Sequence, residues 1–284
     1  MAYKTIISAE DLQQHLGETG WAIIDCRHSL ADPDWGQKVY EEGHIPGAYF
    51  AHLDQDLSSK VIPGKTGRHP LPTDWKAFAK LLGSWGIGEK TQVVAYDASH
   101  GGIASRLWWM LKFLGHEQVA VLDGGWENWV KENRPVSLDI PAKRSDSFAP
   151  VLHIDMVRDM EDVRESLNNK DIQVVDSRAA ERYAGLEEPI DPVAGHIPGA
   201  ENFPFLENVD EHHLWKSRAF LFKRFAPLFG QFNSGQIIVH CGSGVTACHN
   251  LLAMQHAGYE MAKLYPGSWS EWITRKENPV DPGA

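Results

Sequence analysis

The chain has 284 residues, of which 43% are hydrophobic, so it is long enough to form two domains of ordinary size, each with its own core. Its 38 acidic and 27 basic residues give a formal net charge of −11, which disfavours nonspecific binding to nucleic acids or to anionic membranes. Three cysteines are too few for a disulfide framework, no secretory signal precedes them and no apolar run could span a bilayer, so we expect a cytoplasmic protein.

The first half of the chain alternates apolar runs with segments of helical pattern. A helix is expected after Ser8, because Ser8 and Asp11 resemble a capping box. The motifs that follow are "WAIIDCR" at 21–27, "GHIPGA" at 43–48, "QVVAYD" at 92–97 and "VLDGGWENWVKENRPV" at 121–136. This alternation is typical of parallel strands joined by helical crossovers.

The second half repeats these motifs in the same order, about 150 residues later. They are "IQVVDSR" at 172–178, "GHIPGA" at 195–200, "QIIVHC" at 236–241 and "LYPGSWSEWITRKENPV" at 264–280. Asp155 is expected to cap the first helix of this half. The residues between the halves, 138–151, contain two prolines, mixed charges and no periodicity, so they are predicted to form a linker. We therefore predict two α/β domains, 1–137 and 152–284, each a parallel sheet flanked by helices on both faces.

The loop that begins at Cys241 is the strongest candidate for chemistry. Cys241 ends the apolar run "IIVHC", and Gly242 and Gly244 precede a helix expected to begin at Thr246 or Ala247. Ligands bind beyond the carboxyl ends of parallel strands, where such a loop points its N–H groups and its helix N-terminus at one space. This arrangement favours an anion centred on sulfur, which could be a thiolate, a persulfide or a cysteinyl phosphate.

Three other interpretations of this region are possible. Cys241 could be a small packing residue, which is the role we expect for Cys26 and Cys248. A metal site would use the set His240, Cys241, Cys248 and His249. Adjacent residues point to opposite faces of a strand and about 100° apart on a helix, so these side chains are poorly placed to bind one ion, and neither a metal nor another cofactor is expected. A cysteine phosphatase would need an arginine at the sixth residue after the cysteine to hold the phosphate, and that residue is Ala247.

The motifs "CGSGVTA" at 241–247, "HIPGA" at 44–48 and 196–200, and "SWSEW" at 268–272 resemble the tandem-domain rhodanese family, most closely its branch that uses 3-mercaptopyruvate. The resemblance covers nearly the whole chain. It implies two rhodanese domains of which only the second is catalytic, because Asp97 stands in the place of Cys241 and a carboxylate cannot carry a transferable sulfur.

The resemblance also implies a reaction. Cys241 would attack a small anionic sulfur donor, become a persulfide, and pass the outer sulfur to cyanide, a thiol or thioredoxin. The persulfide anion would be stabilised by the loop residues Gly242, Ser243, Gly244, Val245, Thr246 and Ala247. A phosphatase, or a sulfur-binding module without turnover, stays as an alternative.

The identity of the donor depends on charged residues near the loop. Family members that use thiosulfate resemble "Cys-Arg-Lys-Gly-Val-Thr", whereas Gly242 and Ser243 add no charge here, so 3-mercaptopyruvate is favoured and thiosulfate is the alternative donor. Arg182 matches the arginine that binds the donor in the family. A second family arginine is missing, because Ile190 stands in its place, and Lys216 or Arg218 could replace it.

The resemblance further implies a proton relay. It joins the loop hydroxyl to the first-domain "HIPGA" histidine and an upstream aspartate, which match Ser243, His44 and Asp34. His196 occupies the same place in the second half. Bracing of a turn is therefore the alternative role for both histidines.

Overall fold

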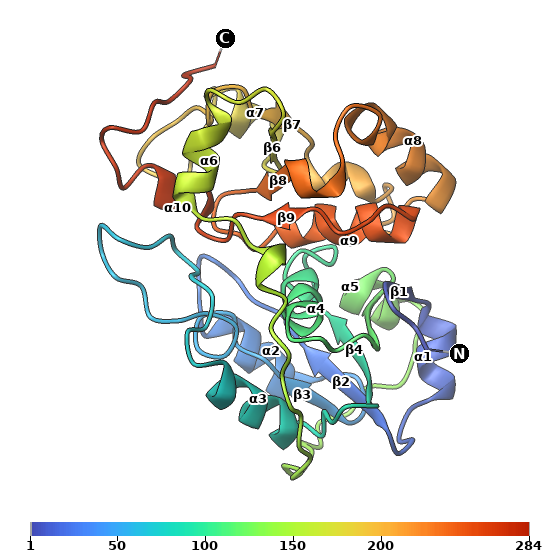
Figure 1. Cartoon of the computed structure of the whole chain (residues 1–284). Coiled ribbons are helices and arrows are strands. Elements are labelled where there is room, and N and C mark those ends of the chain that lie inside the picture. Colours follow the sequence, from blue (N-terminus) through green and yellow to red (C-terminus); the bar gives the residue numbers. More distant parts are fainter. Residues whose placement is uncertain (1, 284) are drawn as a thin grey trace. The chain divides into compact units, whose positions relative to one another are not determined.

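A computed structural model describes residues 2–283 and divides them into two compact units (Figure 1). Unit 1 comprises residues 2–59, 72–153 and 211–215, and unit 2 comprises residues 60–71, 154–210 and 216–283. The segment expected to be a linker lies in unit 1. It is held there by main-chain hydrogen bonds, among them that from the Val151 N–H to the Leu114 carbonyl at 3.0 Å. The loop 60–71, which the sequence placed in the first domain, is part of unit 2.

Unit 1 is built on a five-stranded parallel sheet with the strand order β1-β5-β4-β2-β3. Its strands are β1 (Ile6–Ile7), β2 (Trp21–Asp25), β3 (Ala48–Phe50), β4 (Gln92–Tyr96) and β5 (Val119–Leu122). Its helices are α1 (Ala9–Gln14), α2 (Trp35–Glu42), α3 (Trp75–Ser84), α4 (Ala104–Phe113) and α5 (Gly125–Lys131). All five residues of β4 are buried, as expected for a continuous apolar run at the centre of a parallel sheet.

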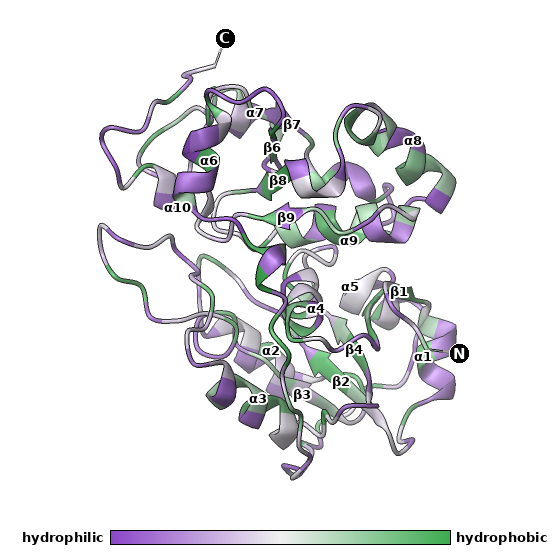
Figure 2. Cartoon of the chain, viewed as in Figure 1, coloured by the Kyte–Doolittle hydropathy of each residue, from purple (hydrophilic) through white to green (hydrophobic). Residues whose placement is uncertain are grey.

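Unit 2 is built on a four-stranded parallel sheet with the strand order β7-β6-β8-β9. Its strands are β6 (Gln173–Asp176), β7 (Glu201–Asn202), β8 (Ile237–His240) and β9 (Lys263–Leu264). Its α-helices are α6 (Met160–Ser166), α7 (Ala180–Tyr183), α8 (Arg218–Phe229), α9 (Ala247–Ala257) and α10 (Ser268–Trp272), and its 3-10 helices are η1 (Ile154–Met156), η2 (Phe205–Asn208) and η3 (Ser234–Gln236). Figure 2 shows that β8 is hydrophobic, and all four of its residues are buried. Both units therefore have the predicted α/β architecture.

The internal repeat is visible as matching contacts in the two units. In unit 1, Arg27 pairs with Asp25 at 2.6 Å and donates to the Gly43 carbonyl at 2.6 Å. In unit 2, Arg178 pairs with Asp176 at 2.6 Å and donates to the Gly195 carbonyl at 2.7 Å. Both ion pairs are almost fully buried. Because each arginine also donates to a glycine carbonyl, it joins the end of one strand to the turn before the next strand. The repeated "D-x-R" and "HIPGA" motifs thus have a shared structural role.

The residue that caps the first helix agrees with the prediction from the sequence in unit 1 and differs from it in unit 2. The Ser8 side chain accepts a hydrogen bond from the Asp11 N–H and caps α1, as predicted. The prediction that Asp155 caps the corresponding helix is wrong. Asp159 is the cap of α6, because it forms a reciprocal capping box with Asp162, whereas Asp155 lies in η1 and faces Lys263. Among residues 2–283, no helix has both the length and the apolar character needed to cross a bilayer.

Candidate functional site

The cysteine loop of unit 2 lies at the carboxyl end of the sheet, between β8 and α9. The strand ends at His240, so Cys241 is the first residue after it, and the Cys241 side chain is 2% exposed. The Gly244 N–H donates a hydrogen bond to Cys241 Sγ at 3.2 Å. Gly244 has a φ of 75°, in the region that favours glycine, and this conformation turns its N–H toward the sulfur.

The remaining N–H groups of the loop are available to an anion. Among the described residues, no acceptor is bonded to the main-chain N–H groups of Gly242, Ser243, Val245, Thr246 and Ala247. Ala247 is the first residue of α9, so the positive end of the helix dipole adds to the positive electrostatic potential inside the loop. A loop with one N–H at the sulfur and several others unoccupied can stabilise negative charge on the sulfur and on an atom bonded to it.

The corresponding loop of unit 1 already holds an anion. The Asp97 carboxylate accepts hydrogen bonds from the N–H groups of Ser99, Gly101, Ile103 and Ala104, at distances of 2.7 to 2.9 Å. The side chain is fully buried, and burial raises the pKa of Asp97 although the four N–H groups oppose this rise. This loop type therefore binds an anion, and in unit 1 the chain's own carboxylate fills it.

The start of α10 fixes the cysteine loop in place. Ser268, with a φ of 56°, accepts the Cys241 N–H on its Oγ at 3.1 Å. The Trp269 and Ser270 N–H groups donate to the carbonyls of Cys241 and Gly242 at 3.0 and 2.9 Å. These bonds explain why the "SWSEW" motif accompanies the cysteine loop in the sequence.

A histidine that the sequence did not indicate lies beside the loop hydroxyl. The Ser243 Oγ and the His69 Nδ1 are 2.8 Å apart, and both side chains are almost fully buried. His69 belongs to the loop 60–71 of unit 2. Its only sequence signal is the motif "GRHPLP" at 67–72, which does not recur in the other half and has no helical or strand periodicity.

The two residues expected to complete the relay lie in unit 1. The His44 ring is fully buried, with Nδ1 at 2.7 Å from the Tyr40 carbonyl and Nε2 at 3.2 Å from the Asp139 carbonyl. His196 makes the matching contact in unit 2, at 2.8 Å from the Tyr183 carbonyl. Asp34 is an exposed residue at the start of α2 and makes no side-chain capping bond. The contacts of His44 correspond to the bracing role named as its alternative.

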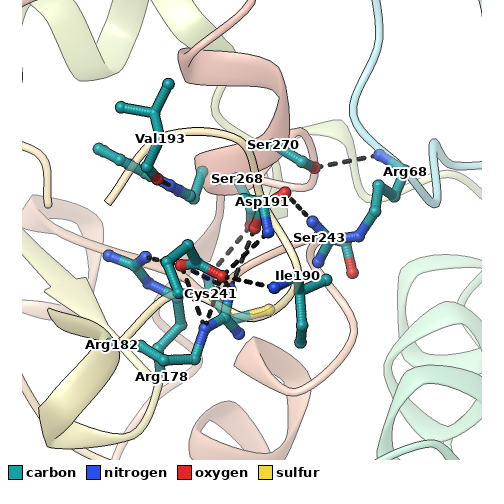
Figure 3. Close-up of polar contacts among 12 residues, drawn as sticks. Arg68, Arg178, Arg182, Ile190, Asp191, Val193, Cys241, Ser243, Ser268 and Ser270 are labelled. Carbon is teal, nitrogen blue, oxygen red and sulfur yellow. Dashed lines mark hydrogen bonds and ion pairs between the residues drawn. The ribbon is translucent and has the colours of Figure 1, made fainter. Parts of the chain in front are cut away.

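Two arginines of unit 2 reach the cysteine loop (Figure 3). Arg182, the predicted donor-binding residue, pairs with Glu188 at 2.7 Å and with Asp191 at 3.0 Å. Arg68, which the sequence did not indicate, pairs with the second oxygen of Asp191. Burial lowers the pKa of Arg68, and the electrostatic interaction of its guanidinium with Cys241 opposes that change. Ile190, which replaces the expected arginine, is 42% exposed.

The other cysteines and the histidines near the loop contact neighbouring protein groups. Cys26, Cys241 and Cys248 are all buried and form no disulfide in the described chain. Burial raises the pKa of Cys26, and the Cys248 thiol donates to the Gly244 carbonyl at 3.4 Å. The His240 Nδ1 faces the Cys241 carbonyl at 3.1 Å, and the His249 Nδ1 lies 3.1 Å from the Asn208 amide.

Two groups of possible metal ligands occur among the described residues, and both lie in unit 1. One consists of His28, His52 and Asp54, and the other of His100, Glu127 and His213. In the second group the two imidazole rings stack with centroids 4.0 Å apart and an interplanar angle of 17°. Stacked rings direct their nitrogen lone pairs in parallel and not toward one ion. Neither group includes Cys241 or its loop.

Comparison with known proteins identifies the family. The model for the rhodanese-like domain matches residues 8–132 and 159–275. A probable 3-mercaptopyruvate sulfurtransferase of Pseudomonas aeruginosa is 40% identical over 284 residues and covers 100% of both chains. A thiosulfate sulfurtransferase of Cricetulus griseus is 35% identical, over 95% of this chain and 92% of its own. The structure of 3-mercaptopyruvate sulfurtransferase from Leishmania major superposes with a TM-score of 0.83 at 27% identity, covering 98% of this chain and 76% of that one. The chain therefore belongs to the family of proteins built from rhodanese-like domains.

Proposed function

We propose that the chain is a sulfurtransferase that moves a sulfur atom from 3-mercaptopyruvate to a thiophilic acceptor through a persulfide on Cys241. The observation that carries this proposal is the position of Cys241 Sγ in a loop whose Gly244 N–H faces it at 3.2 Å and whose other N–H groups have no acceptor among the described residues. The names of the relatives agree with it. The loop suits a persulfide, because an anion on the outer sulfur can use the N–H groups that the thiolate does not.

In the first half of the reaction, the Cys241 thiolate attacks the sulfur of 3-mercaptopyruvate. An S–S bond forms, the C–S bond breaks and its electron pair stays on carbon, which gives the enolate of pyruvate. The proton of the donor's thiol ends on that carbon, so the thiolate and mercaptopyruvate yield a cysteine persulfide anion and pyruvate. The step therefore needs a group that moves one proton from sulfur to carbon.

Ser243 and His69 are the groups that move this proton. Their 2.8 Å contact lets the hydroxyl exchange a proton with the imidazole, and Ser243 is separated from Cys241 by a single residue. His69 takes the role that the sequence assigned to His44. Main-chain carbonyls face both ring nitrogens of His44, at 2.7 and 3.2 Å, so the ring is enclosed by backbone and lies at no donor site. No contact of Asp34 supports a place for it in the relay.

In the second half of the reaction, the acceptor attacks the outer sulfur of the persulfide. With cyanide, the S–S bond breaks, the Cys241 thiolate is restored and thiocyanate leaves. A small thiol or a reduced thioredoxin would react in the same way, with a hydropersulfide or a protein persulfide as the product. Each half leaves the negative charge on atoms within the loop, so the same N–H groups serve both.

The preference for 3-mercaptopyruvate over thiosulfate follows from the charge of the loop. Gly242 and Ser243 add no positive charge beside the sulfur, so a dianion gains less from this loop than from the "Cys-Arg-Lys" loop that thiosulfate users resemble. Thiosulfate is the alternative donor, as in the Cricetulus griseus relative. The higher kcat/KM is expected with 3-mercaptopyruvate.

Intact-mass analysis after exposure to each donor tests the proposal. The parent protein should gain one sulfur atom on Cys241 and then turn over repeatedly with cyanide, and Cys241→Ser should do neither. Cys26→Ser is a matched control, because the other half of the repeat has Ser177 at that position. Transfer by the Cys241→Ser protein would refute the mechanism. A persulfide that forms but never turns over would indicate a sulfur-binding module, and hydrolysis of an aryl phosphate would indicate a phosphatase.

We place the protein in the cytoplasm. Its three cysteines form no disulfide within residues 2–283, as expected where thiols are kept reduced, and a persulfide enzyme needs reduced acceptors. Fractionation of cells that express the chain, with the protein located by immunoblot, checks this assignment. Recovery from an oxidising compartment would contradict it.

A further inference from the structure

Two guanidinium groups meet at Gly242, next to the reactive cysteine. A methyl group on Gly242 would lie 2.9 Å from Arg68 Nη2 and 3.5 Å from both terminal nitrogens of Arg182. The two arginines are more than a hundred residues apart in the sequence, and Figure 3 shows both side chains near Cys241. The absence of a side chain at position 242 therefore leaves room for both cations above the loop.

The hydrogen bonds of these arginines leave specific N–H groups unused. Arg182 uses Nε and Nη2 on Glu188 and Asp191, while its Nη1 has no acceptor among the described residues. Arg68 uses Nη1 on Asp191, and its Nη2 and its buried Nε have no acceptor within residues 2–283. A buried donor without an acceptor is unfavourable, as at Arg68 Nε, and the unused terminal N–H groups of both arginines can bind an anion that supplies oxygen atoms.

Asp191 and the main chain hold Arg68 in this position. Each oxygen of the buried Asp191 carboxylate binds one of the two arginines, which sets the spacing of the guanidinium groups. The Arg68 N–H donates to Ser270 Oγ at 3.0 Å. A side chain on the preceding Gly67 would lie 2.8 Å from the same Oγ, so the backbone of the 60–71 loop lies directly against α10. Arg68 is thus built into the site and is not a surface cation that happens to be nearby.

The residues that could otherwise replace the missing arginine are directed elsewhere. Ile190 is apolar, and its N–H donates to Glu188. The Lys216 ammonium lies over the Phe220 ring, 4.6 Å from its centroid, and the Arg218 Nε donates to the His256 carbonyl at 2.8 Å. Arg68 is the cation that has both the position and the unused donors.

We infer that Arg68 and Arg182 together bind the carboxylate of the sulfur donor, and that Arg68 supplies the second guanidinium that Ile190 cannot. This inference rests on the proposed function. One carboxylate oxygen accepts from Arg182 Nη1, and the other accepts from Arg68 Nη2 or Nε. The charge of Arg68 then selects donors with a carboxylate next to the carbonyl, over neutral thiols of the same shape.

Binding measurements on the inactive Cys241→Ser protein test this inference without requiring sulfur transfer. The probes are 3-mercaptopyruvate and mercaptoacetone, in which a methyl group replaces the carboxylate. Arg68→Ala should weaken binding of 3-mercaptopyruvate by about 10- to 100-fold, the range for one charge-assisted hydrogen-bonding group. Arg68→Lys should fall between it and the parent, because it keeps the charge without the planar donors. Binding of mercaptoacetone should change by less than about threefold.

Arg218→Ala is the matched control, since it removes a guanidinium of unit 2 whose Nε donates to a main-chain carbonyl. Thermal unfolding of each variant shows whether the Arg68 proteins remain folded, and Arg68→Lys retains the test if Arg68→Ala does not. Equal affinities for 3-mercaptopyruvate in the Arg68 and Arg218 variants would overturn the inference. So would an equal loss for the two probes. Because no turnover is measured, a failure of Cys241 to form a persulfide would refute the proposed function and leave this result standing.

Discussion

Gly244→Ala should damage the reaction far more than it damages the fold. Gly244 has a φ of 75°, and a methyl group on it would lie 2.8 Å from Pro266 Cα and also too close to the Pro266 carbonyl. These are main-chain atoms, which cannot rotate away as the end of a side chain can. An ordinary contact needs about 3.4 to 4 Å, so the loop must move by about 1 Å. The N–H that donates to Cys241 Sγ belongs to this same residue.

The expected loss follows from that displacement. A shift of about 1 Å in a reacting group lowers the rate by about 10²-fold, so kcat/KM for 3-mercaptopyruvate should fall by that factor. The strain of a positive φ adds roughly 1 kcal/mol to the destabilisation. The assay is thiocyanate formation at several donor concentrations, together with thermal unfolding of the same protein sample.

Gly199→Ala provides the matched control in the same unit. Gly199 has a φ of 79°, and a methyl group there would meet nothing within 4 Å. This variant therefore carries the same conformational strain without the collision or the displaced N–H, and its kcat/KM should stay within about threefold of the parent. If the two variants lose the same activity, strain alone explains the effect and the role assigned to the Gly244 N–H is wrong.

Three further predictions concern buried polar groups. Asp97→Asn should lower the free energy of unfolding by about 2–5 kcal/mol, because the amide nitrogen replaces an oxygen that accepts two N–H groups. Denaturant titration measures this change, and an unchanged free energy would refute the anion-binding role of the unit 1 loop. His69→Gln should lower kcat by about 10²-fold with little change in melting temperature, because His69 contacts the Ser243 hydroxyl. His44→Gln should lower the melting temperature and leave kcat within about threefold. The reverse pattern would restore His44 to the relay. Burial, helped by Arg218, lowers the pKa of His256 to about 4, so the folded state favours the neutral ring, and the stabilisation present above the unfolded value of 6.5 should be lost as pH falls toward 4. His256→Gln should reduce this loss by about 1–3 kcal/mol, and identical pH profiles of unfolding for parent and variant would contradict the assignment.

Local patterns were sufficient to predict the two sheets and the cysteine loop. "QVVAYD" and "QIIVHC" contain β4 and β8, and the glycines after Cys241 lead into a helix that begins at Ala247, as expected. These features depend on neighbouring residues, so one sequence shows them. The error at Asp155 has the same local basis, because Asp159 and Asp162 lie a few residues further on and form the capping box that starts α6.

The residues that the sequence did not indicate come from one loop with distant partners. His69 meets Ser243, which is 174 residues away, and Arg68 meets Asp191, which is 123 residues away. The motif of the loop 60–71 is not repeated in the second half and the loop has no periodicity, so nothing local indicates that it belongs to unit 2. Residues 211–215, about 150 residues later, are assigned to unit 1 in the same way. A pairing of this kind is set by the packing of Gly67 and Arg68 against α10, and packing over such separations cannot be deduced from residue order alone.

The duplication also gives a physical reason to propose that only the loop of unit 2 is catalytic. Both loops gather N–H groups around an anion, and in unit 1 four of them are satisfied by Asp97. A buried carboxylate with four partners stabilises the loop, but it occupies the N–H groups that a second anion would use and has no sulfur to transfer. Restoring the cysteine would not be sufficient. Tyr40 and Tyr183 make the same contact with the histidine of the repeated motif, so Arg182 corresponds to Val39. Under the proposed function, a thiolate at position 97 would therefore lack the guanidinium that binds the donor's carboxylate. The asymmetry between the units therefore depends on at least two positions, and an Asp97→Cys protein should accept sulfur from 3-mercaptopyruvate at position 97 much more slowly than at Cys241.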